Sequence, residues 1–437
     1  MSNVLYEELE SGIAFLKKRG YLDTSIPNCI NDNMKQPLRD YQIKALENFI
    51  FYCEDNEYKE IPHKHLLFHM ATGSGKTNII ASTILYLYEQ GYRDFIFFVN
   101  TNNIITKTKE NLVNFSSSKY LFKEQIRINN KEVNVNVIED TFDVSRADDI
   151  NILFTTINKL HIDLETTVKE NSITYADFKD RKIVMIADEA HHLNANTKKK
   201  KESEKNWEQT TQNLLKVNKE NILLEFTATQ DLSDAKVAQK YRDKIIYDYA
   251  LKKFRDDGYS KEIKLISDGF NDKQRMLQAV MISEYRRMVA QKELNLSIKP
   301  VVMFKSVKNT VDADGLFETF LTLIEKLCVK DIDEIFEKSG LEVISKLEAY
   351  IEEKEEFIKA LQYGFAKQNC LVIHSKVKDK ELKLQNLNSL EDEHNKIRAI
   401  FAVDILNEGW DVLNLFDIVK LDEVKKQQQV PPVKHNL

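Results

Sequence analysis

A glycine-rich segment near the N-terminal end of the chain has the residue types of a phosphate-binding loop. Residues 70–77 read M-A-T-G-S-G-K-T and stand between an apolar run and a segment with helical periodicity. The two glycines let backbone N–H groups surround phosphate oxygens, which the positive end of the following helix also favours. Lys76 can neutralise the β- and γ-phosphates, and the Thr77 hydroxyl can ligate Mg²⁺. We therefore expect ATP and Mg²⁺ as cofactors. The predicted binding residues are Thr72, Gly73, Ser74, Gly75, Lys76 and Thr77.

A second segment places two carboxylates at the end of an apolar run. Residues 183–191 read I-V-M-I-A-D-E-A-H. A carboxylate at the carboxyl end of a strand can face the phosphate loop, so we expect Asp188 to hold Mg²⁺. Glu189 would then orient and deprotonate the attacking water, and these two residues with Lys76 form the predicted catalytic set. The histidines that follow could indicate zinc, but E-A-H-H lacks the H-E-x-x-H spacing that places two imidazoles on one helix face.

The elements that would position these residues are apolar strands alternating with helix-like segments. Buried parallel strands have this appearance, so the sequence predicts an α/β fold with parallel sheets flanked by helices. The first series of expected strands is HLLFHM, FIFFVN, INILFTT, KIVMIAD and NILLEFTAT. A second, shorter series is KPVVMFKS, CLVIHS, IRAIFAVD and DIVKLDE.

We divide the chain into four parts. An N-terminal helical arm (1–35) precedes a first, ATP-binding domain (36–235), and a connecting segment (236–298) leads to a second, partial domain (299–437). Residues 308–368 are rich in Glu, Lys, Leu and Ile and predict a helical insertion in that second domain.

Composition limits the possible classes of protein. The net charge is −6, from 63 Lys and Arg against 69 Asp and Glu, so a nucleic acid could be bound only through a local basic surface. The sequence has neither a signal peptide nor an apolar stretch of about 18 residues, so we expect a soluble, cytoplasmic protein without membrane contact. Four widely spaced cysteines without a CxxC pair are best explained as reduced side chains.

The phosphate loop and the D-E-A-H segment together resemble those of superfamily-2 helicases and translocases of the DEAD/DEAH type. L-R-D-Y-Q, residues 38–42, is similar to the adenine-reading segment of several such families, which implies a base contact for Gln42. T-T-I-N-K-L, residues 155–160, resembles the segment that holds the nucleic-acid backbone, through Thr155, Thr156 and Lys159. Such contacts position a nucleic acid without reading its sequence.

Two further segments extend this resemblance. F-T-A-T, residues 226–229, is similar to the coupling motif, in which Thr227 and Thr229, with His191, would link the nucleotide site to the nucleic-acid groove. I-F-A-V-D-I-L-N-E-G-W-D-V, which begins at residue 400, resembles the motif in which Gly409 and Asp411 approach the nucleotide.

One family within this superfamily is similar over about residues 36–424. D-E-A-H-H-L-N-A, Trp207 with Glu208, L-L-E-F-T-A-T and KIIYDYALKKFRDDGYSK closely resemble the motor subunit of type III restriction enzymes. This resemblance implies tandem RecA-like domains with a P-loop NTPase fold. It also implies an ATP-driven motor that acts on double-stranded DNA and works with a DNA-methylating modification subunit.

The end of the sequence departs from that family. After Asp422 the family has a Q-x-x-G-R-G-x-R segment and later a nuclease region, whereas this sequence reads E-V-K-K-Q-Q-Q-V-P-P-V-K-H-N-L. We therefore expect a C-terminally truncated second domain that binds ATP and hydrolyses it slowly, since such arginines contribute about 10³–10⁵ in rate. Two alternatives remain open: a nucleotide- and DNA-binding remnant with little turnover, and another superfamily-2 DNA or RNA helicase.

Overall fold

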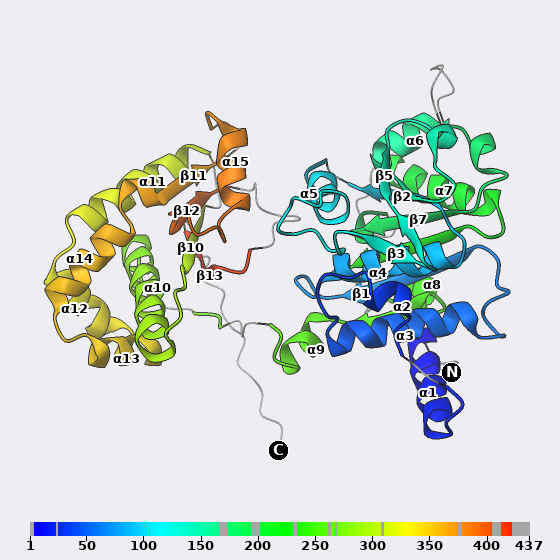
Figure 1. The fold of residues 1–437 in the computed structure, drawn as a ribbon. Coiled ribbons are helices and arrows are strands. Elements are labelled where there is room, and N and C mark those ends of the chain that lie inside the picture. The colour runs from blue at the N-terminus through cyan, green and yellow to red at the C-terminus, as the bar shows by residue number, and fades with distance from the viewer. Residues whose placement is uncertain are drawn as a thin grey trace. The chain divides into compact units, whose positions relative to one another are not determined.

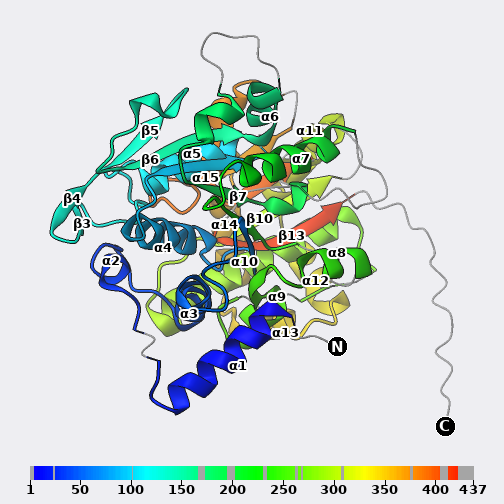
Figure 2. The same cartoon turned by 90° about the vertical axis from the view of Figure 1, so that its right-hand side faces the viewer.

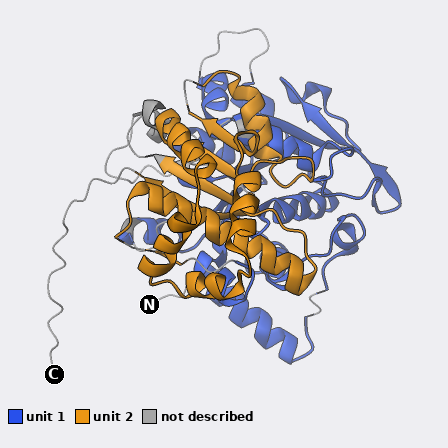
Figure 3. Cartoon of the chain, turned by 90° about the vertical axis from the view of Figure 1, so that its left-hand side faces the viewer, with its two compact units in different colours: residues 1–263 blue, residues 264–437 orange. Residues whose placement is uncertain are grey.

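The computed structural model of the chain divides into two compact units, residues 1–263 and 264–437 (Figure 3). Each unit is built around a parallel sheet with helices packed on it (Figure 1). The α/β fold class predicted from the sequence is therefore confirmed. The structure describes residues 4–22, 25–100, 102–165, 173–193, 202–229, 234–260, 264–266, 269–306, 310–374, 377–403 and 412–421.

The first unit contains a seven-stranded sheet in the order β5-β6-β2-β7-β8-β1-β9, in which neighbouring strands are parallel. The first series of expected strands is confirmed as β1, β2, β6, β7 and β8, and β5 and β9 add one strand at each edge. A small antiparallel hairpin, β3 with β4, is separate from this sheet (Figure 2). The strands of the unit are β1 (Lys64–Met70), β2 (Asp94–Val99), β3 (Ile126–Ile128), β4 (Lys131–Val133), β5 (Val135–Ile138), β6 (Ile150–Thr156), β7 (Ile183–Asp188), β8 (Ile222–Thr227) and β9 (Ile245–Tyr249).

α-Helices lie in most of the connections between successive strands of this sheet, as is usual for parallel strands, whereas the connection from β5 to β6 contains only a 3₁₀ helix. Helix α4 begins at Lys76, directly after Gly75, and ends at Glu89, shortly before Gly91 adopts a φ of +88°. A left-handed glycine is a common way to end a helix, so the sequence signal at Gly91 has a local physical cause. The α-helices are α1 (Leu5–Lys18), α2 (Asn28–Asn31), α3 (Asp40–Glu54), α4 (Lys76–Glu89), α5 (Asn102–Leu112), α6 (Ile157–Glu165), α7 (Glu202–Val217), α8 (Ala235–Tyr241) and α9 (Leu251–Asp256). Three 3₁₀ helices accompany them: η1 (Phe142–Val144), η2 (Tyr175–Phe178) and η3 (Ala190–Leu193).

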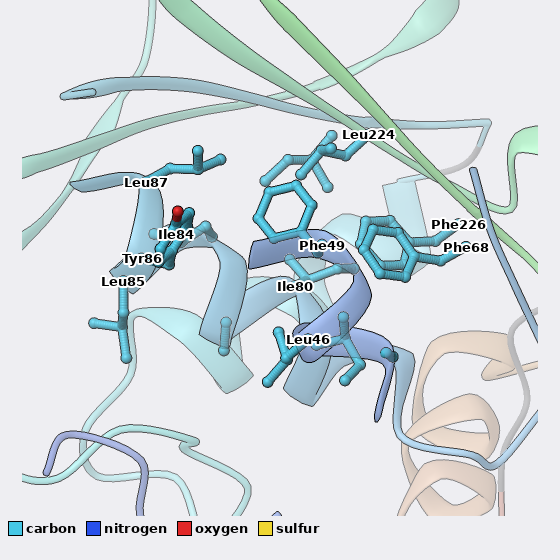
Figure 4. Close-up of a cluster of buried hydrophobic side chains, with 14 of the residues drawn as sticks. Leu46, Phe49, Phe68, Ile80, Ile84, Leu85, Tyr86, Leu87, Leu224 and Phe226 are labelled. Carbon is cyan, nitrogen blue, oxygen red and sulfur yellow. The ribbon is translucent and has the colours of Figure 1, made fainter. Parts of the chain in front are cut away.

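Hydrophobic side chains cover both faces of the seven-stranded sheet. On one face, Phe49 of α3 and Ile80 of α4 pack near Phe68 and Phe226, whose rings stack with centroids 4.7 Å apart (Figure 4). On the other face, residues of α6 and α7 such as Leu214 pack on β2, β7 and β8. Burying a large apolar side chain contributes about 1.5–3 kcal/mol, so these layers hold the sheet edge on which the site depends.

The second unit contains a four-stranded parallel sheet in the order β11-β12-β10-β13, which corresponds to the second series of expected strands. Its strands are β10 (Val301–Ser306), β11 (Cys370–Ile373), β12 (Ala399–Ala402) and β13 (Leu415–Leu421). Its helices are α10 (Asp272–Leu294), α11 (Thr310–Glu325), α12 (Val329–Lys338), α13 (Glu342–Tyr350), α14 (Lys354–Gly364) and α15 (Lys380–Asn388), with the 3₁₀ helix η4 (Lys367–Asn369). Helices α11 to α14 follow one another between β10 and β11, in the region where we expect a helical insertion.

The segment expected to connect the domains, 236–298, is shared between the two units. Strand β9 pairs with β1 at the edge of the first sheet, whereas α10 packs in the hydrophobic core of the second unit. Among the described residues, no helix is long and apolar enough to cross a bilayer.

Candidate active site

The carboxyl ends of three neighbouring strands bring the predicted catalytic residues together. In the order β7-β8-β1, the strand that ends at Thr227 lies between the strand that ends at Asp188 and the strand that leads into loop 71–75. The register pairs Thr227 with His69 and Phe226 with Asp188. Because the strands are parallel, their carboxyl ends lie at the same edge, where α/β sheets bind ligands. Residues far apart in the sequence therefore meet at one place.

Loop 71–75 has a backbone that depends on its two glycines. Gly73 and Gly75 both have a φ of +78°, a left-handed conformation that glycine adopts at little cost. A β-carbon at Gly73 would meet no atom within 4 Å, so this part of the loop borders open space. A β-carbon at Gly75 would lie 2.5 Å from Gln42 Nε2, so no larger residue fits without displacing that side chain.

Two side chains in the first turn of α3 form hydrogen bonds with the loop backbone. The Tyr41 hydroxyl donates a hydrogen bond to the Ser74 carbonyl oxygen (2.9 Å), and Gln42 Nε2 donates to the same oxygen (3.1 Å). Gln42 Oε1 accepts from the backbone N–H of Arg39 (3.0 Å), and the Gln42 side chain is only 2% exposed. Gln42, which the resemblance assigns to the base edge, therefore fixes the loop backbone in this structure. Tyr41 has the same role, which the sequence analysis missed although it lies in the same motif.

Lys76 and Asp188 lie close enough to influence each other's charge. Lys76 is buried, in the first turn of α4, at 9% exposure. Burial raises the pKa of the Asp188 carboxyl to about 6, and the charge of Glu189 adds to this effect. The Lys76 ammonium and the Glu189 backbone N–H, 3.0 Å from Asp188 Oδ1, act in the opposite direction. A cation bound beside Asp188 would likewise favour the ionised carboxylate.

The predicted coupling residues form a connected group with Glu189. His191 Nδ1 lies 3.1 Å from the Thr227 hydroxyl oxygen and 3.4 Å from Glu189 Oε2. The backbone N–H of Thr229 donates to the same Thr227 oxygen (3.3 Å). Glu189 has a φ of +52°, which costs a residue with a side chain about 1–3 kcal/mol. Such strain is typical of functional sites.

The predicted nucleic-acid residues lie at the same edge of the sheet: Thr155 and Thr156 end β6, and Lys159 is in the first turn of α6. Strand β2 separates them from β7: Phe98 pairs in register with both Thr155 and Ala187. The Thr155 side chain is buried, and its hydroxyl donates to the Thr156 carbonyl oxygen (3.3 Å). The Thr156 hydroxyl oxygen accepts from the backbone N–H of Lys159 (3.2 Å) at the start of α6. Lys159 is the member of this group with an exposed side chain.

A histidine in β1 is a further polar feature that the sequence analysis did not recognise. His69 Nδ1 lies 2.6 Å from Asp248 Oδ1, and His69 is 7% exposed. The signal was a histidine inside the apolar run HLLFHM, one residue before the loop motif begins. Gly409 and Asp411, the predicted nucleotide contacts from the second half, lie outside the described residues.

Comparison with known proteins identifies the relatives of this chain. The family model described as type III restriction enzyme, res subunit, matches residues 35–232. A probable type III restriction-modification enzyme HindVIP Res subunit from Haemophilus influenzae is 38% identical over 449 residues. That match covers 91% of this chain and 86% of the relative.

Solved structures resemble the chain at much lower identity. The ATP-dependent Type ISP restriction-modification enzyme LlaBIII bound to DNA is 12% identical with a TM-score of 0.49. The match covers 88% of this chain and 26% of that one, so this chain spans about a quarter of that enzyme. The DEAD-box helicase Mss116 bound to ssRNA and UDP-BeF is also 12% identical, with a TM-score of 0.43 and coverage of 96% and 70%.

Proposed function

The chain belongs to the family of type III restriction enzyme Res subunits, and we propose that it is the ATP-dependent motor subunit of a type III restriction-modification system. It would bind and hydrolyse ATP with Mg²⁺ and act on double-stranded DNA together with a DNA-methylating modification subunit. The observation that supports this most directly is the shared strand edge, where loop 71–75 and Lys76 lie beside Asp188.

The residues at this edge fit a nucleoside triphosphate. Gly73 borders open space, and the loop leads into the N-terminus of α4, whose backbone N–H groups attract anions. Lys76 brings a positive charge to the same place. The Ser74 hydroxyl oxygen is buried and has no hydrogen-bond partner among the described residues. A phosphate oxygen could supply that partner and would offset the cost of leaving a buried hydroxyl unpaired.

Each residue has a distinct proposed role in hydrolysis. Lys76 neutralises the outer phosphates, while Thr77 and Asp188 hold the metal ion. Mg²⁺, when bound there, neutralises charge that develops on the phosphate oxygens. Glu189 orients the attacking water and accepts its proton. The left-handed backbone of Glu189 and its proximity to His191 support a fixed orientation for that carboxylate.

Coupling and DNA contact involve the neighbouring residues. The change from bound ATP to bound ADP would be transmitted along the strand edge by His191, Thr227 and Thr229. Their polar atoms link the segment after β7 to the end of β8. Lys159 would contact DNA phosphates, as a charge that positions the duplex without reading its sequence.

The test is steady-state ATP hydrolysis by the purified chain, measured without nucleic acid, with duplex DNA and with single-stranded RNA. Lys76→Ala should abolish the activity. The matched control is Lys219→Ala, which removes an exposed lysine from the segment before β8, at the opposite edge of the sheet.

We expect duplex DNA to stimulate ATP turnover. The Lys219→Ala variant should keep this activity, and the Lys76→Ala variant should lack it. Stimulation by RNA alone would favour an RNA helicase instead. If the chain binds ATP but does not hydrolyse it under any of these conditions, the proposed motor activity is wrong and only nucleotide binding remains.

A further inference from the structure

A cluster of aromatic side chains lies against the phosphate loop. The Tyr41 ring stacks on Tyr249, with centroids 4.5 Å apart and planes inclined by 12°. It also meets Tyr259 edge to face at 4.9 Å. The Tyr41 hydroxyl donates to the Ser74 carbonyl oxygen of the loop. Tyr259 is therefore one side chain away from the loop backbone.

A glycine turn folds Tyr259 back into this position. Helix α9 ends at Asp256, and Gly258 then adopts a φ of +79°. The backbone N–H of Tyr259 donates to the Phe254 carbonyl oxygen (3.1 Å), a reversal typical of a glycine at a helix C-terminus. The Tyr259 ring lies nearly parallel to that of Phe254, at 12° and 6.0 Å. The sequence D-D-G-Y thus fixes where the ring stands.

Tyr259 is unlike the other rings of the cluster because it faces solvent. It is 40% exposed, whereas Tyr41 and Tyr249 are each 3% exposed. The guanidinium carbon of Arg39, an exposed residue, lies 5.4 Å from the Tyr259 ring centroid. Arg39 Nη1 also donates to the Tyr41 hydroxyl oxygen (3.3 Å). A flat base can stack on both kinds of group, on a phenol ring and on a guanidinium plane.

We propose that Tyr259 is the stacking surface for the base of the bound nucleoside triphosphate, with Arg39 closing over the other face of the base. This proposal rests on the proposed function, because loop 71–75 must hold the phosphates. The Arg39 side chain is exposed, and it would move outward to let a base enter between the two groups. The side-chain amide of Gln42 already forms hydrogen bonds with Arg39 and with the loop backbone. Stacking on Tyr259 would therefore supply the affinity for the base in place of a hydrogen bond from Gln42.

The test compares ATP with inorganic tripolyphosphate, which carries the phosphates without the base. Binding of each to the full chain is measured by calorimetry with Mg²⁺ for the wild type, Tyr259→Ala and Tyr259→Phe. We expect Tyr259→Ala to weaken ATP binding by about 5- to 150-fold, the range for loss of one base-stacking contact. Tripolyphosphate affinity should not change, and Tyr259→Phe should bind ATP like the wild type because it keeps the ring.

Tyr363→Ala is the matched control, since it removes an 81% exposed tyrosine from α14 of the second unit. Equal weakening of ATP and tripolyphosphate by Tyr259→Ala would show that the ring only supports the loop and would overturn the proposal. Unchanged ATP affinity in Tyr259→Ala would also overturn it. A wild type that binds tripolyphosphate as tightly as ATP would refute the base contact alone, whereas one that binds neither would refute the proposed function as well.

Discussion

Asp188 should make magnesium-dependent nucleotide binding sensitive to pH near 6. Burial, with a smaller contribution from the Glu189 charge, raises the pKa of its carboxyl to about 6, and a metal ion must displace the proton before it can bind there. With that pKa, about half of the carboxyl groups are ionised at pH 6 and about one in eleven at pH 5. Apparent Mg²⁺-ATP affinity should therefore fall about 11-fold at pH 5 through this group, and by only about 10% at pH 7.

The opposite pH dependence is expected without the metal. A neutral Asp188 repels the phosphates less than an ionised one, so metal-free ATP should bind more tightly as the pH falls through 6. Folding stability should depend on pH in the same direction. Because the pKa of Asp188 is raised in the folded chain, this group stabilises the fold at a pH below the ordinary pKa of a carboxyl group, and the contribution is lost as the pH rises through about 6.

The assay is the ratio of ATP dissociation constants with Mg²⁺ and with a chelator, measured from pH 5 to 8. Protonation of ATP itself contributes to both the wild type and Asp188→Asn, so the difference between their profiles isolates Asp188. The Mg²⁺ measurement alone should change the wild-type ratio about fivefold between pH 5 and 6 and about twofold between pH 6 and 8, and the measurement with chelator adds to this change in the same direction. A ratio that is flat across the range, or one that has the same inflexion in Asp188→Asn, would refute the reasoning.

Three further substitutions test other parts of the site. Gly75→Ala places a β-carbon on a residue with a left-handed backbone and brings it against Gln42. ATP affinity should therefore fall about tenfold or more while the fold persists. Unchanged affinity would contradict the loop geometry. Phe68→Ala removes a fully buried ring and should lower the free energy of unfolding by about 3–5 kcal/mol in urea titrations; a loss below about 1 kcal/mol would show that this core is not closely packed. Thr227→Val keeps the shape but removes the hydroxyl beside His191, so DNA-stimulated turnover should fall about 2- to 10-fold with ATP affinity retained. A fall in affinity alone would argue against coupling.

The phosphate loop and the main strands could be predicted because their signals are local. The glycines at 73 and 75, the apolar run before them and the helical spacing after them all lie within one continuous segment. Strands β5 and β9 were missed because edge strands are short and carry polar residues, as in V-N-V-I and I-I-Y-D-Y. Their assignment depends on pairing with β6 and β1, which are distant in the sequence or separated by loops.

Side-chain direction was harder to predict than position. The motif places Gln42 in the first turn of α3, yet its hydrogen bonds depend on a loop 32 residues away. The resemblance assigns Thr155 to a nucleic-acid contact, and the structure adds that its side chain is buried, which the motif alone does not indicate. The positive φ of Glu189 likewise has no sequence signal, because the residue is not a glycine and tertiary contacts must hold it there.

The two hydrogen bonds that converge on the Ser74 carbonyl oxygen have a consequence for binding kinetics. Tyr41 and Gln42 hold the loop backbone through hydrogen bonds that the protein supplies from its own side chains. Fixing a flexible backbone costs about 1–2 kcal/mol per residue, and a loop that is already ordered avoids this cost during association. Nucleotide capture should therefore follow a single step whose rate rises linearly with ligand concentration, without the plateau that a slow ordering of the loop would impose.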